Sequence, residues 1–175
     1  MSLIKPFSGI RPKKKFAKQV TSPNVSYIDD YKPNKKLNFL NLLNTSKINT
    51  SKKILKSLKD KGIIQQDRSN HFYLYRITYN NKKLLGIVGK INLDNYDDKK
   101  ILGHEETFAE RIKKRKEQLL KFNSQISPIY TTYKTTPNSL KKLINIFKFR
   151  PDYNFKSKDK CRHELWVVKK NNIEK

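Results

Sequence analysis

The sequence predicts an α+β protein with a mixed or antiparallel sheet, flanking helices and a basic surface. Some segments are rich in aromatic and β-branched residues, as strands are, whereas others repeat apolar residues at helical spacing. The two kinds of segment do not alternate strictly, which argues against a doubly wound parallel sheet. With 175 residues, 35% of them hydrophobic, the chain is long enough for one packed core.

The N-terminal segment differs in composition from the rest of the chain. Four of the seven prolines lie within residues 1–36, so we expect an extended arm with turns. A short strand is expected at its start, from Leu3 to Phe7. We therefore divide the chain into an arm over residues 1–36 and an α+β domain over residues 37–175.

A helix is predicted from Thr50 or Ser51, either of which can cap it, to a stop at Lys61-Gly62. The next two predicted elements are the strands of a hairpin. Phe72 to Thr78 and Leu84 to Ile91 flank the turn-like pair Asn80-Asn81. Alternation along the first strand places half of its aromatic side chains in the core, although such aromatics also stack on bases in single-strand binders.

The second half of the chain predicts two more helices and two more strands. Apolar residues at helical spacing indicate one helix between Glu105 and Phe122, and Asn138 can cap another. Strands are expected at Ile129 to Tyr133 and at Leu165 to Val168. The lysines of the first of these helices lie off its apolar stripe and are expected to face water.

The net charge of +25 raises the possibility of nucleic-acid binding. However, 33 of the 40 basic residues are lysines, and an AT-rich genome favours lysine, asparagine and isoleucine codons. Arginine is the better bidentate ligand for phosphates and base edges, so its scarcity argues against dedicated recognition. We expect only weak, nonspecific binding to nucleic acid.

Several classes of site and location lack support in the sequence. Neither GxGxxG nor GxxxxGK[ST] occurs, and Cys161 with His163 supplies only two of the four ligands that a zinc site needs, so no metal site is expected. No long apolar run predicts a membrane span or a signal peptide, and a single cysteine suits a reducing compartment. We expect a cytoplasmic protein.

The densest group of chemically capable side chains is His104, Glu105, Thr107 and Arg111. A histidine and a carboxylate can exchange protons, and an arginine can neutralise a phosphate or carboxylate. We predict that His104, Glu105 and Arg111 meet in one solvent-reachable cleft. The alternative is an ordinary helix start, at which acidic residues are favoured by the helix dipole.

Motifs spread along the chain resemble the family known as domain of unknown function 1015. They are Ile4-Lys5-Pro6-Phe7 with Gly9, Arg11 and Pro12; Phe72-Tyr73 with Tyr75-Arg76; Gly86 with Val88; His104-Glu105 with Thr107 and Arg111; Pro128-Ile129 with Thr132-Tyr133; and His163 with Leu165-Trp166-Val167. A DGHHR motif that usually follows in this family is not found before Lys175. We therefore expect the N-terminal part of a larger fold, with a separately encoded C-terminal half as a candidate partner.

The resemblance also implies a chemistry. The DGHHR motif is similar to one in the ParB-like group that includes free-serine kinases, so the intact family is expected to use ATP or ADP with Mg²⁺ to phosphorylate serine or a similar small molecule. By this resemblance His104, Glu105 and Arg111 are expected to be catalytic, and Thr107 and Arg11 to bind substrate. A chain without the second motif is expected to be inactive alone. A catalytically silent remnant and a nonspecific nucleic-acid binder are the alternatives.

Overall fold

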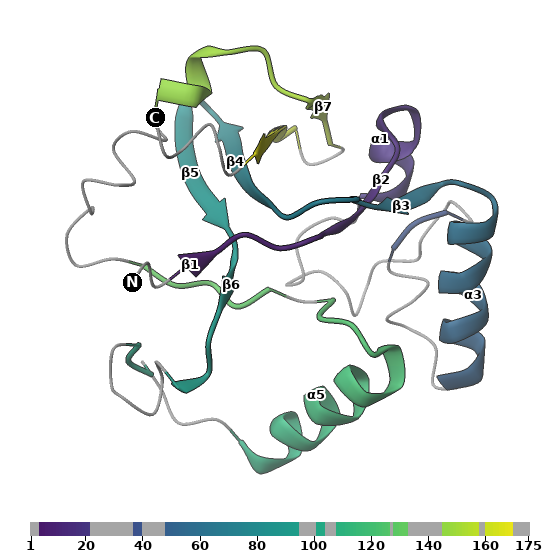
Figure 1. The fold of residues 1–175 in the computed structure, drawn as a ribbon. Helices are drawn as coiled ribbons and strands as arrows, with labels where there is room; N and C mark the ends of the chain where they lie inside the picture. Colours follow the sequence, from purple (N-terminus) through teal and green to yellow (C-terminus); the bar gives the residue numbers. More distant parts are fainter. Residues whose placement is uncertain are drawn as a thin grey trace.

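The computed structural model describes residues 4–21, 37–39, 48–94, 101–103, 108–126, 128–132, 145–157 and 160–169. Helices and antiparallel strands alternate irregularly, which confirms the predicted α+β class (Figure 1). The elements in chain order are β1 (Ile4–Lys5), β2 (Ile10–Pro12), the 3-10 turn η1 (Lys14–Phe16), α1 (Ala17–Val20), α3 (Ile48–Asp60), β3 (Ile64–Gln66), β4 (His71–Tyr79), β5 (Lys82–Val88), β6 (Lys90–Ile91), α5 (Ala109–Phe122), the 3-10 turn η3 (Asn145–Lys148), β7 (Tyr153–Lys156) and β8 (Arg162–Lys169).

The largest sheet has four antiparallel strands in the order β5-β4-β8-β7. The β4–β5 hairpin turns at Asn80 and Asn81, whose φ angles of 45° and 63° suit a tight hairpin turn. β8 then pairs with β4 over its whole length, although the two strands are far apart in sequence. β7 forms the opposite edge from β5.

The two faces of this sheet differ in chemistry. Cross-strand partners share a face, so Phe72 and Leu74 lie beside Val168 and Trp166 in a buried cluster. Ile146 and Phe147 of η3 pack against this cluster, together with Ile4 of β1. The other face carries three tyrosines, a phenylalanine and a histidine, and this face positions the candidate site. These residues are Tyr73, Tyr75, Tyr153, Phe155 and His163.

A second hydrophobic cluster joins the helices to the short strands. Val20 of α1, Leu58 of α3 and Ile64 of β3 are buried in it, and Phe122 at the end of α5 packs against it. β3 pairs with β2, and β6 pairs with β1. The N-terminal strands therefore pair with strands from later in the chain (Figure 1).

Some predicted elements needed correction. A strand is predicted from Ile129 to Tyr133, but residues 129–132 have no regular secondary structure, and Tyr133 lies outside the described residues. The predicted strand from Leu84 to Ile91 is interrupted at Gly89, after which β6 pairs with a different strand. β2, β3 and β7 were not predicted, because strands of three or four residues give too short an alternating pattern.

The predicted helices were recovered in part. α3 begins two residues before Thr50 and ends before Gly62, whose φ of 60° explains the stop. α5 begins at Ala109, but much of its predicted apolar stripe is exposed, with 72% of Phe108 and 53% of Ile112 accessible. The helix start predicted at Asn138 lies outside the described residues, and Phe147 belongs to η3.

Candidate functional site

Most of the site predicted from sequence lies outside the described part of the chain. His104, Glu105 and Thr107 are not among the described residues. Arg111 lies in α5, but its side chain is not described. The convergence of His104, Glu105 and Arg111 on one cleft therefore stays a prediction. Arg11 is the one member of the predicted set whose surroundings are described.

Arg11 lies in β2 and binds a carboxylate from the loop between β3 and β4. Its Nε donates to both carboxylate oxygens of Asp67 at 2.9 Å, and its Nη2 lies 2.7 Å from Asp67 Oδ1. Its Nη1 donates to the hydroxyl of Tyr153 in β7. Only 6% of the Asp67 side chain is accessible, so the ion pair is largely shielded from solvent.

Tyr73 and Tyr153 extend this network in two directions. The Tyr73 hydroxyl donates to Asp67 Oδ2 at 2.7 Å and accepts from the backbone N–H of Gly9 at 2.8 Å. A Cβ atom at Gly9 would lie 2.7 Å from the same hydroxyl, so only glycine allows this approach. The Tyr153 hydroxyl donates to the carbonyl of Pro12 at 2.6 Å. The network joins β2, β4, β7 and the β3–β4 loop.

Contacts within the network change the pKa values of its members, and the changes favour a charged Asp67 and a charged Arg11. Burial raises the pKa of Asp67, but hydrogen bonds from Arg11 and Tyr73 outweigh burial and hold that pKa below its usual value. Hydrogen bonding to Asp67 raises the pKa of Arg11. Burial, followed by the Asp67 hydrogen bond, raises the pKa of Tyr73 to about 12, so Tyr73 is a neutral donor at physiological pH. Arg11 and Asp67 are therefore an ion pair.

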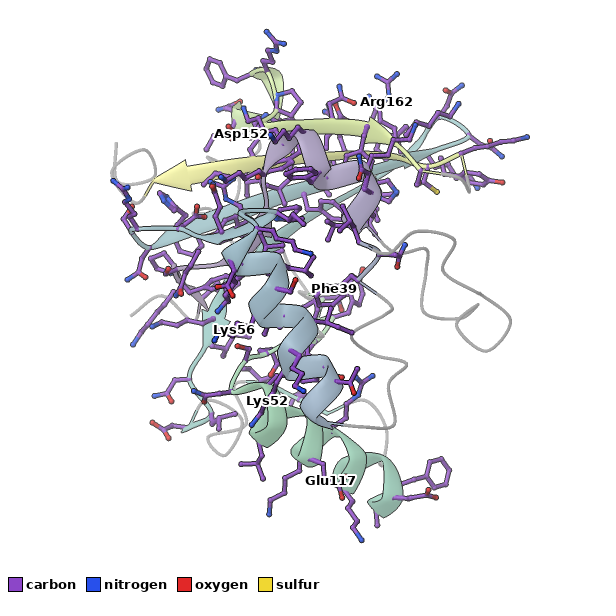
Figure 2. The ribbon with its side chains drawn as sticks, turned by 90° about the vertical axis from the view of Figure 1, so that its right-hand side faces the viewer. Phe39, Lys52, Lys56, Glu117, Asp152 and Arg162 are labelled. Atoms are coloured by element: carbon purple, nitrogen blue, oxygen red, sulfur yellow. The ribbon has the colours of Figure 1, made fainter. Side chains whose placement is uncertain are left out.

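A groove of about 700 Å³ lies next to this network, between the η1–α1 segment and β7. Figure 2 looks onto this side of the molecule, where α1 lies in front of the strands with Asp152 beside it. One wall comes from the turn and helix that follow β2, and the other from β7 and the residues before it. Its lining residues are Lys14, Lys15, Ala17, Lys18, Arg150, Pro151, Asp152, Tyr153, Asn154 and Phe155.

The lining of the groove is strongly cationic. Lys14, Lys15, Lys18 and Arg150 contribute four positive charges, against the single carboxylate of Asp152. The Nζ of Lys14 lies 3.6 Å from that carboxylate, in an exposed pair that contributes little stability. Because Arg11 and Pro12 bind Tyr153, the network fixes the spacing of the two walls. The arrangement suits an anionic ligand.

Sequence reasoning missed this groove and most of the network. Lys13-Lys14-Lys15 directly follows Arg11-Pro12, and this local charge run was the only available signal. Arg11 and Tyr153 are 142 residues apart, so no local pattern could pair them. The described residues contain no group of three or more side chains that could hold a metal ion, and no described helix is long and apolar enough to cross a membrane.

Comparison with known proteins identifies the family of the chain. The family model described as Protein of unknown function (DUF1015) matches residues 4–175. No curated protein and no solved structure matches the chain. The match includes both the Arg11 strand and the residues that line the groove. The chain therefore belongs to the DUF1015 family of proteins of unknown function.

Proposed function

We propose that this DUF1015 protein binds the phosphate group of a small molecule in the groove between η1–α1 and β7, as part of a phosphoryl-transfer activity. The observation that carries the proposal is the set of four cations, with one carboxylate, around a groove of about 700 Å³. That volume is typical of small-molecule sites. Lysine ammonium groups bind phosphate oxygens through charge-assisted hydrogen bonds.

The finer proposal follows the resemblance to kinases. The acceptor would be a small hydroxyl compound such as serine, and the donor ATP or ADP with Mg²⁺. His104, Glu105 and Arg111 are the proposed groups for proton transfer and charge neutralisation, and Thr107 and Arg11 the proposed contacts to substrate. Arg11 also binds Asp67 and Tyr153, and these bonds hold the wall of the groove next to the proposed substrate. The proposed location is the cytoplasm.

Calorimetric titration with ATP, ADP and inorganic tripolyphosphate tests the proposal. The test variant is Lys14→Ala/Lys18→Ala, which removes two groove cations. The control is Lys52→Ala/Lys56→Ala, which removes two exposed lysines at the same spacing from α3, away from α1 (Figure 2). We expect the groove variant to bind about tenfold more weakly, corresponding to about 1.4 kcal/mol, and the control variant to bind like the wild type.

The control also separates the groove from nonspecific charge. If both variants bind the phosphate compounds equally weakly, the groove is not the binding site. That result would favour the alternative, in which a lysine-rich surface attracts polyanions, including nucleic acid. Binding of that kind falls steeply as salt rises, because it depends on counterion release. Retention of the difference between the two variants at physiological salt supports the proposed function.

A further inference from the structure

Three polar side chains form a hydrogen-bonded chain on the face of the four-stranded sheet that carries Tyr73 and Tyr153. Ser157, directly after β7, places its Oγ 2.6 Å from Nε2 of His163 in β8. The other ring nitrogen, Nδ1, lies 2.6 Å from the hydroxyl of Tyr75 in β4. All three side chains are partly exposed. A hydroxyl, an imidazole and a third group that orients the imidazole make up the usual arrangement for activating a nucleophile.

Aromatic rings on both sides hold the imidazole in place. Phe155 stacks on His163 with ring centroids 5.3 Å apart and planes 21° from parallel. Tyr75 stacks on it at 6.1 Å and 26°. Phe155 also lines the cationic groove, so this histidine lies one ring away from the groove wall. The position of His163 is therefore linked to the proposed phosphate site.

A second serine–histidine pair in the same chain provides a comparison. Ser69 Oγ lies 3.1 Å from Nε2 of His71. Within the described residues, Nδ1 of His71 is buried and has no hydrogen-bond partner. Nδ1 of His71 therefore has no described partner that orients its ring, whereas Nδ1 of His163 is hydrogen-bonded to the Tyr75 hydroxyl.

We propose that Ser157 is a nucleophile that accepts a phosphoryl group from a phosphoanhydride bound in the adjacent groove, with His163 as its general base and Tyr75 as a positioning residue. This inference rests on the proposed function for the source of the phosphoryl group. In the step, Ser157 Oγ forms a bond to phosphorus while the bond from phosphorus to the bridging oxygen breaks. The Ser157 proton passes to His163 Nε2, and from there to the leaving phosphate or to water.

The heavy-atom positions are compatible with two proton arrangements, and the step needs one of them. In one, Tyr75 donates to Nδ1, Nε2–H donates to Ser157, and the Ser157 hydroxyl donates to the carbonyl of Cys161, 2.9 Å away. In the other, Nδ1–H donates to Tyr75 and Nε2 accepts the Ser157 proton. The second arrangement is the reactive one, because only a neutral Nε2 lone pair can take the proton.

A neutral fluorophosphonate probe, followed by peptide mass mapping, tests the nucleophile independently of the groove. We expect Ser157 to be labelled at least about tenfold faster than Ser69, at a rate that rises with pH as imidazole loses its proton. His163→Gln should slow labelling about a hundredfold and remove this pH dependence, as expected for loss of a general base. Tyr75→Phe, which keeps the stacked ring, should slow labelling less. Circular dichroism establishes that each variant is folded.

Equal labelling of Ser69 and Ser157, or an unchanged pH profile in folded His163→Gln, would contradict the assignment of Ser157 as a nucleophile with His163 as its base. Incubation with ATP or acetyl phosphate tests the donor, and we expect phosphoserine at position 157 that is reduced in Lys14→Ala/Lys18→Ala. Probe labelling without phosphoserine from either donor would overturn the phosphoryl assignment. Labelling by the neutral probe reports on Ser157, whereas calorimetric binding of tripolyphosphate reports on the groove, so failure of the groove and failure of Ser157 give different results.

Discussion

Arg11 shows how one side chain determines the geometry around the groove. Its guanidinium binds Asp67 with two nitrogens and Tyr153 with the third, so three segments distant in sequence meet at one residue. A lysine could not replace this planar arrangement of donors. Asp67 in turn accepts from Tyr73, so the carboxylate has a partner on each side. Loss of the carboxylate would leave a partly buried guanidinium without its charge partner.

We predict that Asp67→Asn lowers the free energy of unfolding by about 3 kcal/mol, because it breaks a shielded ion pair while leaving Arg11 charged. Urea unfolding monitored by circular dichroism measures this change. Asp94→Asn is the control, because Asp94 is exposed and its carboxylate is not part of the network. Equal unfolding free energies for the two variants would show that the network does not stabilise the fold.

At the scale of single residues, the sequence predicted which side chains are chemically capable but not which of them meet. Arg11 was selected because a family motif contains it. Asp67, Tyr153 and Ser157 are not indicated by the sequence, because their partners lie between 4 and 142 residues away and no spacing rule connects them. The sequence indicates His163 only as a possible metal ligand and as part of a family motif, whereas the described structure places it between two aromatic rings.

At the scale of elements, the β4–β5 hairpin was the most predictable part of the fold. Its two strands are long and its turn residues, Asn80 and Asn81, accept positive φ more readily than most residues do. By contrast, β7 has only four residues and gains its place by pairing with β8 and by the Tyr153 hydrogen bonds. Tertiary contacts, not local sequence, determine that strand.

We predict that Asn81→Val lowers the unfolding free energy by about 1 to 2 kcal/mol, because a β-branched residue is strained at a φ of 63°. Asn81→Gly should unfold at or near the wild-type denaturant concentration, because glycine adopts positive φ without steric cost. Thermal and urea unfolding of the two variants measure the difference. A Val variant as stable as the Gly variant would show that the turn conformation does not limit stability.

At the scale of the whole molecule, two carboxylates make the fold sensitive to acid. Hydrogen bonds from Arg76 lower the pKa of Glu164, which lies on the opposite face of the sheet from Tyr73, and Arg11 and Tyr73 together lower that of Asp67. The unfolded values are about 4.3 and 3.9, so both groups stabilise the fold fully above about pH 5. That stabilisation is lost as the pH falls through the lower folded values.

We therefore predict that the unfolding free energy is nearly constant from pH 7 to about pH 5 and falls below about pH 4. Glu164→Gln/Asp67→Asn should be less stable at neutral pH and should show a flatter dependence on pH. Urea unfolding at a series of pH values measures how the unfolding free energy depends on pH in the wild type and in the double variant. An acid slope that is equally steep in the double variant would assign the acid sensitivity to other carboxylates.

The groove between η1–α1 and β7 is proposed to be a phosphate site and not merely one part of a basic surface. Amide chemical shifts recorded by NMR during titration with tripolyphosphate at physiological salt test it most directly. We predict saturable shifts that concentrate at residues 14–18 and 150–155 and that are lost in Lys14→Ala/Lys18→Ala. Small shifts spread over all exposed lysines, including Lys52 and Lys56 of α3, without saturation, would contradict the claim.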